Sequence, residues 1–230
     1  MSKKRFTSKT YLKWLILAGV LAVIGGGAGT FATFNATTTN ASNTFATGTL
    51  VLKNDVAAGT CFSTGAGTVT DTNVNSACSA AFTATIKKPG DVATGNVTLQ
   101  NVGTLPASNL TLTVSSCTPS DAPGTYHGTG NPCTALNFYV QEYSDAFSTP
   151  SKCWYGGGTA TTCDFVTSPL SLTGFGTSPV DISGTPPAFA ATGNTGDTRW
   201  FAVAVQLPQG AGNQYQGRQA NIDLSWEESQ

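Results

Sequence analysis

The chain has 230 residues, with 11 cationic and 12 acidic side chains and a single histidine. Five of the cations lie within residues 1–13, so the remaining six face all twelve acids and give the rest of the chain a net charge of about −6. This acidic, charge-poor composition argues against nucleic acid as a partner, because phosphate neutralisation needs clustered basic side chains.

Residues 1–32 have the pattern of a secretory signal peptide. A basic region precedes an apolar run of about 11 residues, Trp14 to Ile24, and small residues follow. The run is well short of the roughly 20 residues that cross a bilayer as a helix. We expect cleavage between Ala32 and Thr33, with an uncleaved N-terminal anchor as the alternative. The protein is therefore expected to be secreted, in an extracellular matrix or at the cell surface.

Residues 33–44 form a polar, uncharged segment, and strand patterns begin after it. Apolar residues alternate with polar ones, as in strands that bury one face. Lys88–Asp91 (KPGD) is expected to form a turn, because Pro pre-sets its backbone angle and Gly accepts a positive φ at the next position. The expected strands are residues 45–52, 82–86, 97–101, 110–114, 136–143, 201–207 and 222–226, with short ones near Trp154 and Ile182.

These runs predict an all-β fold with one domain over residues 45–230. In the last strand, Ile222, Leu224 and Trp226 are expected to face inward. About eight strands with long excursions between them suggest a jelly-roll-like β-sandwich.

All six cysteines follow the predicted signal peptide, and an even number outside the cytoplasm indicates three disulfides. The sequence alone does not fix their pairing. Sequential pairing is preferred, because each pair then brackets a loop rich in Gly, Ser and Thr. The six residues are Cys61, Cys78, Cys117, Cys133, Cys153 and Cys163.

Three ordered sets of motifs carry a resemblance to a known family. The first is Gly29–Phe34 (GTFATF) with Asn43–Leu50 (NTFATGTL). The second is KPGD with residues 97–105 (VTLQNVGTL), and the third is Asn213–Gly217 (NQYQG) with the terminal residues 224–230 (LSWEESQ). Together they resemble the TasA/camelysin family of secreted biofilm matrix fibre proteins, which carry a SipW-type signal peptide. The resemblance covers about a third of the chain, and residues 115–198 match no family motif.

The resemblance implies a jelly-roll-like domain that polymerises into extracellular fibres. In the family's fibres the N-terminal segment of one subunit completes a sheet of the next subunit as a donated strand. The segment here suits that role, because it is β-prone, uncharged and free of proline. Asn35 stands where the family commonly has an acidic residue, and six cysteines are unusual for it. The candidate donor residues are Thr33, Phe34, Asn35, Ala36, Thr37, Thr38 and Thr39.

The expected partners are therefore other copies of the chain, signal peptidase during export, and matrix polysaccharide or surface proteins as further candidates. Two simpler alternatives remain for the N-terminal part of the chain. Residues 33–44 can be a disordered leader, and Phe45 and Leu50 can belong to a self-contained first strand.

No motif in the sequence favours catalysis, a metal or a cofactor. There is no HExxH, and the single histidine, His127, cannot provide a histidine-rich zinc site or, without a GxSxG elbow, a convincing serine triad. We therefore predict a non-enzymatic protein. The alternatives are a monomeric adhesion module that binds through its long loops and, less favoured, a camelysin-type protease. Glycan stacking on Trp154, Tyr155 or Tyr215 is considered, with ordinary packing preferred for all three.

Overall fold

β-Structure dominates the part of the chain that the computed structural model describes, residues 48–65, 73–82, 88–185 and 187–230. These ranges contain eleven strands and three short helical turns, all within the unit Thr47–Gln230. None of their helices is long and apolar enough to cross a membrane. The predicted signal peptide, the Ala32/Thr33 cleavage site and the candidate donor segment lie outside the described residues.

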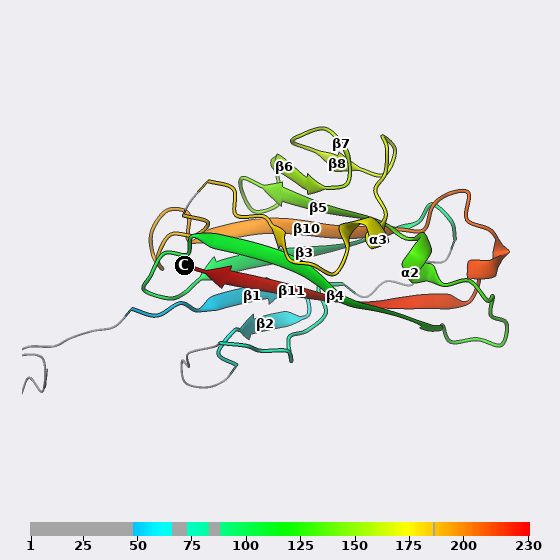
Figure 1. The fold of residues 1–230 in the computed structure, drawn as a ribbon, viewed down its shortest axis with the longest axis horizontal. Helices are drawn as coiled ribbons and strands as arrows, with labels where there is room; N and C mark the ends of the chain where they lie inside the picture. The colour runs from blue at the N-terminus through cyan, green and yellow to red at the C-terminus, as the bar shows by residue number, and fades with distance from the viewer. Residues whose placement is uncertain (1–47, 66–72, 83–87, 186) are drawn as a thin grey trace, which may run out of the picture. The chain divides into compact units, whose positions relative to one another are not determined.

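The larger sheet has six strands, and every neighbouring pair is antiparallel (Figure 1). Long strands from the middle and end of the chain form its centre, and a short hairpin forms one edge. Across the sheet the order is β2 (Gly59–Phe62), β1 (Leu52–Val56), β3 (Val92–Asn101), β10 (Thr198–Gln206), β5 (Asn137–Tyr143) and β6 (Pro150–Tyr155).

The smaller sheet has three strands, and its main part is the long antiparallel pair β4 and β11. Figure 1 shows this pair crossing in front of the larger sheet. The order is β11 (Arg218–Ser229), β4 (Asn109–Asp121) and β9 (Val180–Asp181). The remaining elements are the ribbon of β7 (Gly157–Gly158) and β8 (Cys163–Asp164), the helices α2 (Pro132–Ala135) and α3 (Leu172–Phe175), and the 3₁₀ turn η1 (Asn213–Tyr215).

One apolar core joins the two sheets. Alternating side chains of β3, β5 and β10 pack against the inward side chains of β4, and β11 adds partly buried residues. The ring centroids of Phe201 on β10 and Trp226 on β11 lie 5.2 Å apart. The all-β prediction is confirmed, and the strands are arranged as two facing sheets of unequal width.

The predicted strands in the centre of the larger sheet agree with the structure, although β3 begins five residues earlier than expected. The predicted turn at Lys88–Asp91 is present, with Gly90 at φ +90° and the Asp91 N–H donating to the Lys88 carbonyl at 3.2 Å. Ile222, Leu224 and Trp226 share one face of β11 and pack against the core, as expected. The predicted strand at 82–86 lies mostly outside the described residues.

Two predictions at the edges of the fold are wrong. The described part of the predicted 45–52 strand is extended backbone without strand pairing, and β1 begins only at Leu52 and turns directly into β2. The predicted loop from Cys117 to Cys133 begins inside a strand, because β4 continues to Asp121 beside β11. The pairing of β4 with β11 shifts register at Asp223/Leu224. The alternation of buried and exposed side chains in β4 therefore ends at Val114, although the strand itself continues.

The three disulfides follow the sequential pairing Cys61–Cys78, Cys117–Cys133 and Cys153–Cys163. Each closes a short stretch of chain, of 10 to 17 residues, next to the sandwich. Three disulfides are typical of proteins that fold in an oxidising compartment.

Candidate functional site: an open groove beside the last strand

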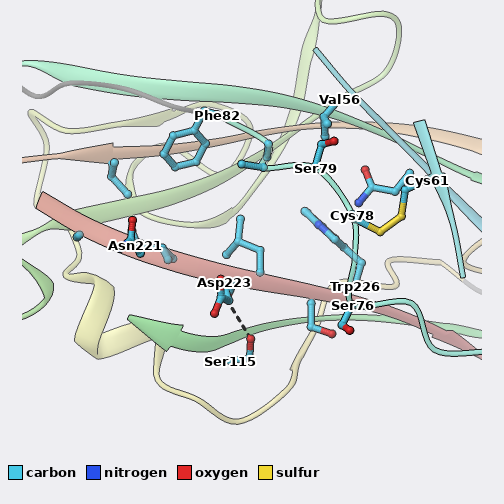
Figure 2. Close-up of a pocket in the computed structure, with 18 of the residues that line it drawn as sticks. Val56, Cys61, Ser76, Cys78, Ser79, Phe82, Ser115, Asn221, Asp223 and Trp226 are labelled. Atoms are coloured by element: carbon cyan, nitrogen blue, oxygen red, sulfur yellow. Dashed lines mark hydrogen bonds between the residues drawn. A yellow bond between two sulfur atoms is a disulfide. The ribbon is translucent and has the colours of Figure 1, made fainter. Parts of the chain in front are cut away.

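The outer edge of the smaller sheet is the most unusual feature of the fold. β11 pairs with β4 along one edge, and no strand among the described residues pairs with its other edge. A groove of about 1280 Å³ opens on that side. It lies between β11, the β1–β2 hairpin and the segment 73–82, as Figure 2 shows in close-up.

The floor and walls of the groove contain apolar and polar side chains in similar measure, and the floor is apolar. Ala93 of β3 and Val205 of β10 belong to the buried core and reach its floor. The inward residues of β11 form one wall and are only partly buried. Leu52 and Val56 of β1, together with Phe82, contribute to the opposite wall. In Figure 2 Trp226 points from β11 towards the segment that carries Cys78 and Ser79.

Cross-links hold the segment 73–82 in place as a wall. The Cys61–Cys78 disulfide ties it to β2. The Asn75 side-chain amide donates to the Phe62 carbonyl at 2.9 Å, and the Asn73 amide donates to the Leu50 carbonyl at 2.8 Å. The first disulfide therefore shapes the groove, although this stretch has no regular secondary structure.

One end of the groove is polar. Both carboxylate oxygens of Glu228 are buried and have no hydrogen-bond partner among the described residues, and the same holds for Oδ1 of Asn54. Both residues line the groove, Glu228 from β11 and Asn54 from β1. Burial raises the pKa of the Glu228 carboxyl from 4.5 to about 7. The groove thus combines an apolar stretch with unpaired acceptors.

The other residues that the sequence singled out have structural roles in the described part of the chain. The ring nitrogens of His127 lie 2.8 Å from the Gly217 carbonyl and 3.0 Å from the Gly124 carbonyl, so this exposed ring holds its loop against the start of β11. Trp154 Nε1 donates to Glu142 at 2.7 Å, and the Tyr155 hydroxyl donates to the Ser171 carbonyl at 2.7 Å. Tyr215 packs against the core. Within the described ranges, no group of three or more His, Cys, Asp or Glu side chains could hold a metal ion.

The groove and its two unpaired residues were not anticipated from the sequence. A signal for Glu228 was nevertheless present. Ile222, Leu224, Trp226 and Glu228 follow a two-residue period, so the inward face of the last strand had to carry a carboxylate at its end. Asn54 gave no comparable signal, because the hairpin that holds it was not predicted.

Comparison of the sequence with known protein families finds no match, and no curated protein matches it. The open edge of β11 and the groove beside it are the candidate functional features of the described residues.

Proposed function

We propose that this chain is a secreted structural protein that polymerises into extracellular or biofilm matrix fibres. In each fibre contact the N-terminal segment of one subunit, beginning at Thr33, fills the groove of the next subunit as a donated strand. The observation that carries the proposal is the edge of β11, which lacks a described strand partner along a groove that reaches the core.

Strand addition would supply what this edge lacks. A strand edge presents unpaired backbone N–H and C=O groups, and a second chain can satisfy them through main-chain hydrogen bonds. Side chains on one face of the added strand would cover the partly buried residues Ile222, Leu224 and Trp226. The smaller sheet, with three strands against six, would gain a strand and come closer to a complete jelly roll.

The proposed occupant has suitable length and chemistry. The 14 residues from Thr33 to Ala46 span at most about 50 Å when extended, which is enough to leave their own domain and lie along a neighbouring strand. They carry no charge and no proline, so they bring no unpaired charge into the groove and every backbone N–H remains able to donate.

The family resemblance supports the same reading. Two of the stretches that resemble the TasA/camelysin proteins, residues 43–50 and 224–230, contribute Leu50 and residues 224–228 to the groove lining. The motif residues therefore lie at the proposed contact. The proposal contains no catalytic step and no cofactor.

The proposal is tested with three forms of the protein compared by negative-stain microscopy and sedimentation. The first begins at Thr33, the second retains residues 25–32, and the third begins at Phe45 and lacks the donor segment. We expect concentration-dependent filaments from the first form only. The circular dichroism spectra of the three forms should match, and so should the melting temperatures of the dilute, unassembled proteins. Filaments from the Phe45 form would contradict strand donation. Monodisperse particles from all three would favour a monomeric adhesion module instead.

A further inference from the structure

We infer that Glu228 and Asn54 form the recognition end of the groove, where they accept hydrogen bonds from a hydroxyl or carboxamide side chain of the inserted segment and fix its register. This inference rests on the proposed function, because it names the chemistry by which the groove would select the N-terminal segment of a second copy.

The strand registers place the two residues at the same end of the sandwich. Asn54 on β1 pairs with Leu99 of β3, which pairs in turn with Arg199 of β10. On the other sheet Glu228 pairs with Leu110 of β4. The two levels are joined by hydrogen bonds, since the Arg199 guanidinium donates to the Ile182 carbonyl at 2.9 Å and the Ile182 N–H donates to the Leu110 carbonyl at 2.9 Å.

The acceptors at this end are buried, and no donor among the described residues compensates them. A carboxylate that leaves water without gaining hydrogen-bond donors destabilises the folded state, so buried acceptors are normally paired. Both Glu228 oxygens and Asn54 Oδ1 depart from that rule, and they do so in one groove. Because two residues from different sheets both have buried acceptors without hydrogen bonds, we infer a missing donor rather than an isolated packing defect.

No described cation of the groove supplies that donor. Arg218, the only positively charged residue in the described lining, stands ten residues away along β11 and is paired with Asp121. Two other acids also line the groove, but Asp223 accepts from the Ser116 hydroxyl at 2.6 Å and Glu227 is exposed to solvent. The raised pKa of Glu228 agrees with this isolation. A neutral donor is therefore the appropriate ligand.

The order of residues in the N-terminal segment matches the order along the groove. The segment reads Phe34 and Ala36 and then Thr38 and Asn40 at alternate positions, apolar first and donor-bearing afterwards. The groove face of β11 reads apolar from Ile222 to Trp226 and then Glu228. With Phe34 against Ile222 or Leu224, a strand that runs in the same direction as β11 brings Asn40 or Thr38 level with Glu228. A strand in the opposite direction would end at Thr33 before reaching it.

The experiment compares the chain that begins at Thr33 with its Glu228→Leu, Glu228→Gln and Glu227→Gln variants. Thermal melts of the dilute protein report the monomer, and sedimentation across a concentration series reports the critical concentration for fibres. A synthetic peptide of residues 33–43 is also titrated into each protein, with Trp226 fluorescence as the readout of groove binding. Glu227→Gln is the charge control, since it removes one carboxylate from the neighbouring residue of the same groove, where that carboxylate is exposed to solvent.

We expect Glu228→Leu to melt at a higher temperature than the wild type and yet to raise the critical concentration about tenfold, a factor that corresponds to 1.4 kcal/mol. Glu228→Gln retains an acceptor and should stay within about threefold of the wild type, a shift of less than 1 kcal/mol. Glu227→Gln should change both quantities less than Glu228→Leu does, because its carboxylate is exposed to solvent. Peptide affinities should follow the same order as the critical concentrations.

Two outcomes overturn the inference and separate it from the proposed function. If the wild type forms fibres and Glu228→Leu assembles and binds the peptide equally well, the recognition role fails while strand donation stands. If the wild type neither forms fibres nor binds the peptide, both fail. If Glu228→Leu does not fold, the recognition role is tested with Glu228→Gln and with Asn54→Leu. We expect Asn54→Leu to lose peptide affinity about tenfold, because it also removes a buried acceptor of the groove.

Discussion

Replacing Glu228 by Gln should remove a pH dependence of stability that the wild-type fold carries. Burial raises the pKa of this carboxyl from 4.5 to about 7. The folded state therefore favours the protonated form, and the contribution to stability is fully present below pH 4.5 and is lost as the pH rises to about 7. The loss amounts to at most about 3 kcal/mol, since a difference of one in pKa corresponds to about 1.4 kcal/mol.

Urea denaturation of the chain that begins at Thr33, at a series of pH values from 4 to 8, measures this effect. The wild-type free energy of unfolding should fall across the range relative to Glu228→Gln, whose amide stays neutral. In thermal melts the same difference would be about 6 to 12 °C for a domain of this size. Taking the difference between the two proteins cancels the titration of all other groups.

The reasoning would be refuted by parallel pH profiles for the wild type and Glu228→Gln. That result would mean that the carboxylate is solvated or paired in solution, and the groove would then have no unmet acceptor at this position. A profile with the opposite slope, in which the wild type gains stability with rising pH relative to the variant, would indicate a hidden cationic partner.

Three further changes should report on the scaffold around the groove. Arg199→Met should lower the free energy of unfolding in urea by about 3 kcal/mol or more, because it leaves the largely buried carboxylate of Glu142 without its ion-pair partner at 2.8 Å. Adding Glu142→Gln should recover part of this loss of stability. Asn101→Leu should cost about 3 kcal/mol in the same assay, because this fully buried amide bridges three backbone groups. Replacing Cys61 and Cys78 by Ser should cost at most about 3 kcal/mol, for a loop of 17 residues. In sedimentation assays this double variant should lose more assembly than the Arg199→Met protein, because it releases a wall of the groove.

The parts of the fold that could be predicted are those that a short stretch of sequence determines on its own. The strands β3, β5 and β10 lie in the middle of the larger sheet, and their large apolar residues recur at every second position, as in Phe201, Val203 and Val205 of β10. Burial itself alternates cleanly only in β3, because β5 and β10 also bury small or polar residues between the large ones. The turn at Lys88–Asp91 follows from the backbone preferences of Pro and Gly alone. The cysteine pairing followed from proximity along the chain, since each pair closes a short loop.

The parts that could not be predicted depend on contacts between distant segments. β1 carries Asn54 between Leu52 and Val56 on its inward face, so its apolar alternation is interrupted at the residue that faces the groove. The pairing of β4 with β11 shifts register at Asp223/Leu224, and beyond Val114 the residues of β4 are mostly polar and only partly buried or exposed. The groove itself exists only when β1, β11 and the segment 73–82 are brought together, which no local pattern encodes.

The same two residues thus mark both a failure of local prediction and the proposed site of recognition. A core strand optimised only for the stability of a monomer would carry apolar side chains at positions 54 and 228, and the alternation would then have been complete. An Asn and a Glu at these positions destabilise the fold, because their buried acceptors lack donors among the residues that the structure describes. A donor that arrives from a second copy of the chain would offset that cost. A segment rich in Thr and Asn, carried at the N-terminus of every copy of the chain, would supply such a donor each time two subunits meet. The fold would then be most stable in the polymer, and the unsatisfied acceptors of the monomer would themselves favour assembly.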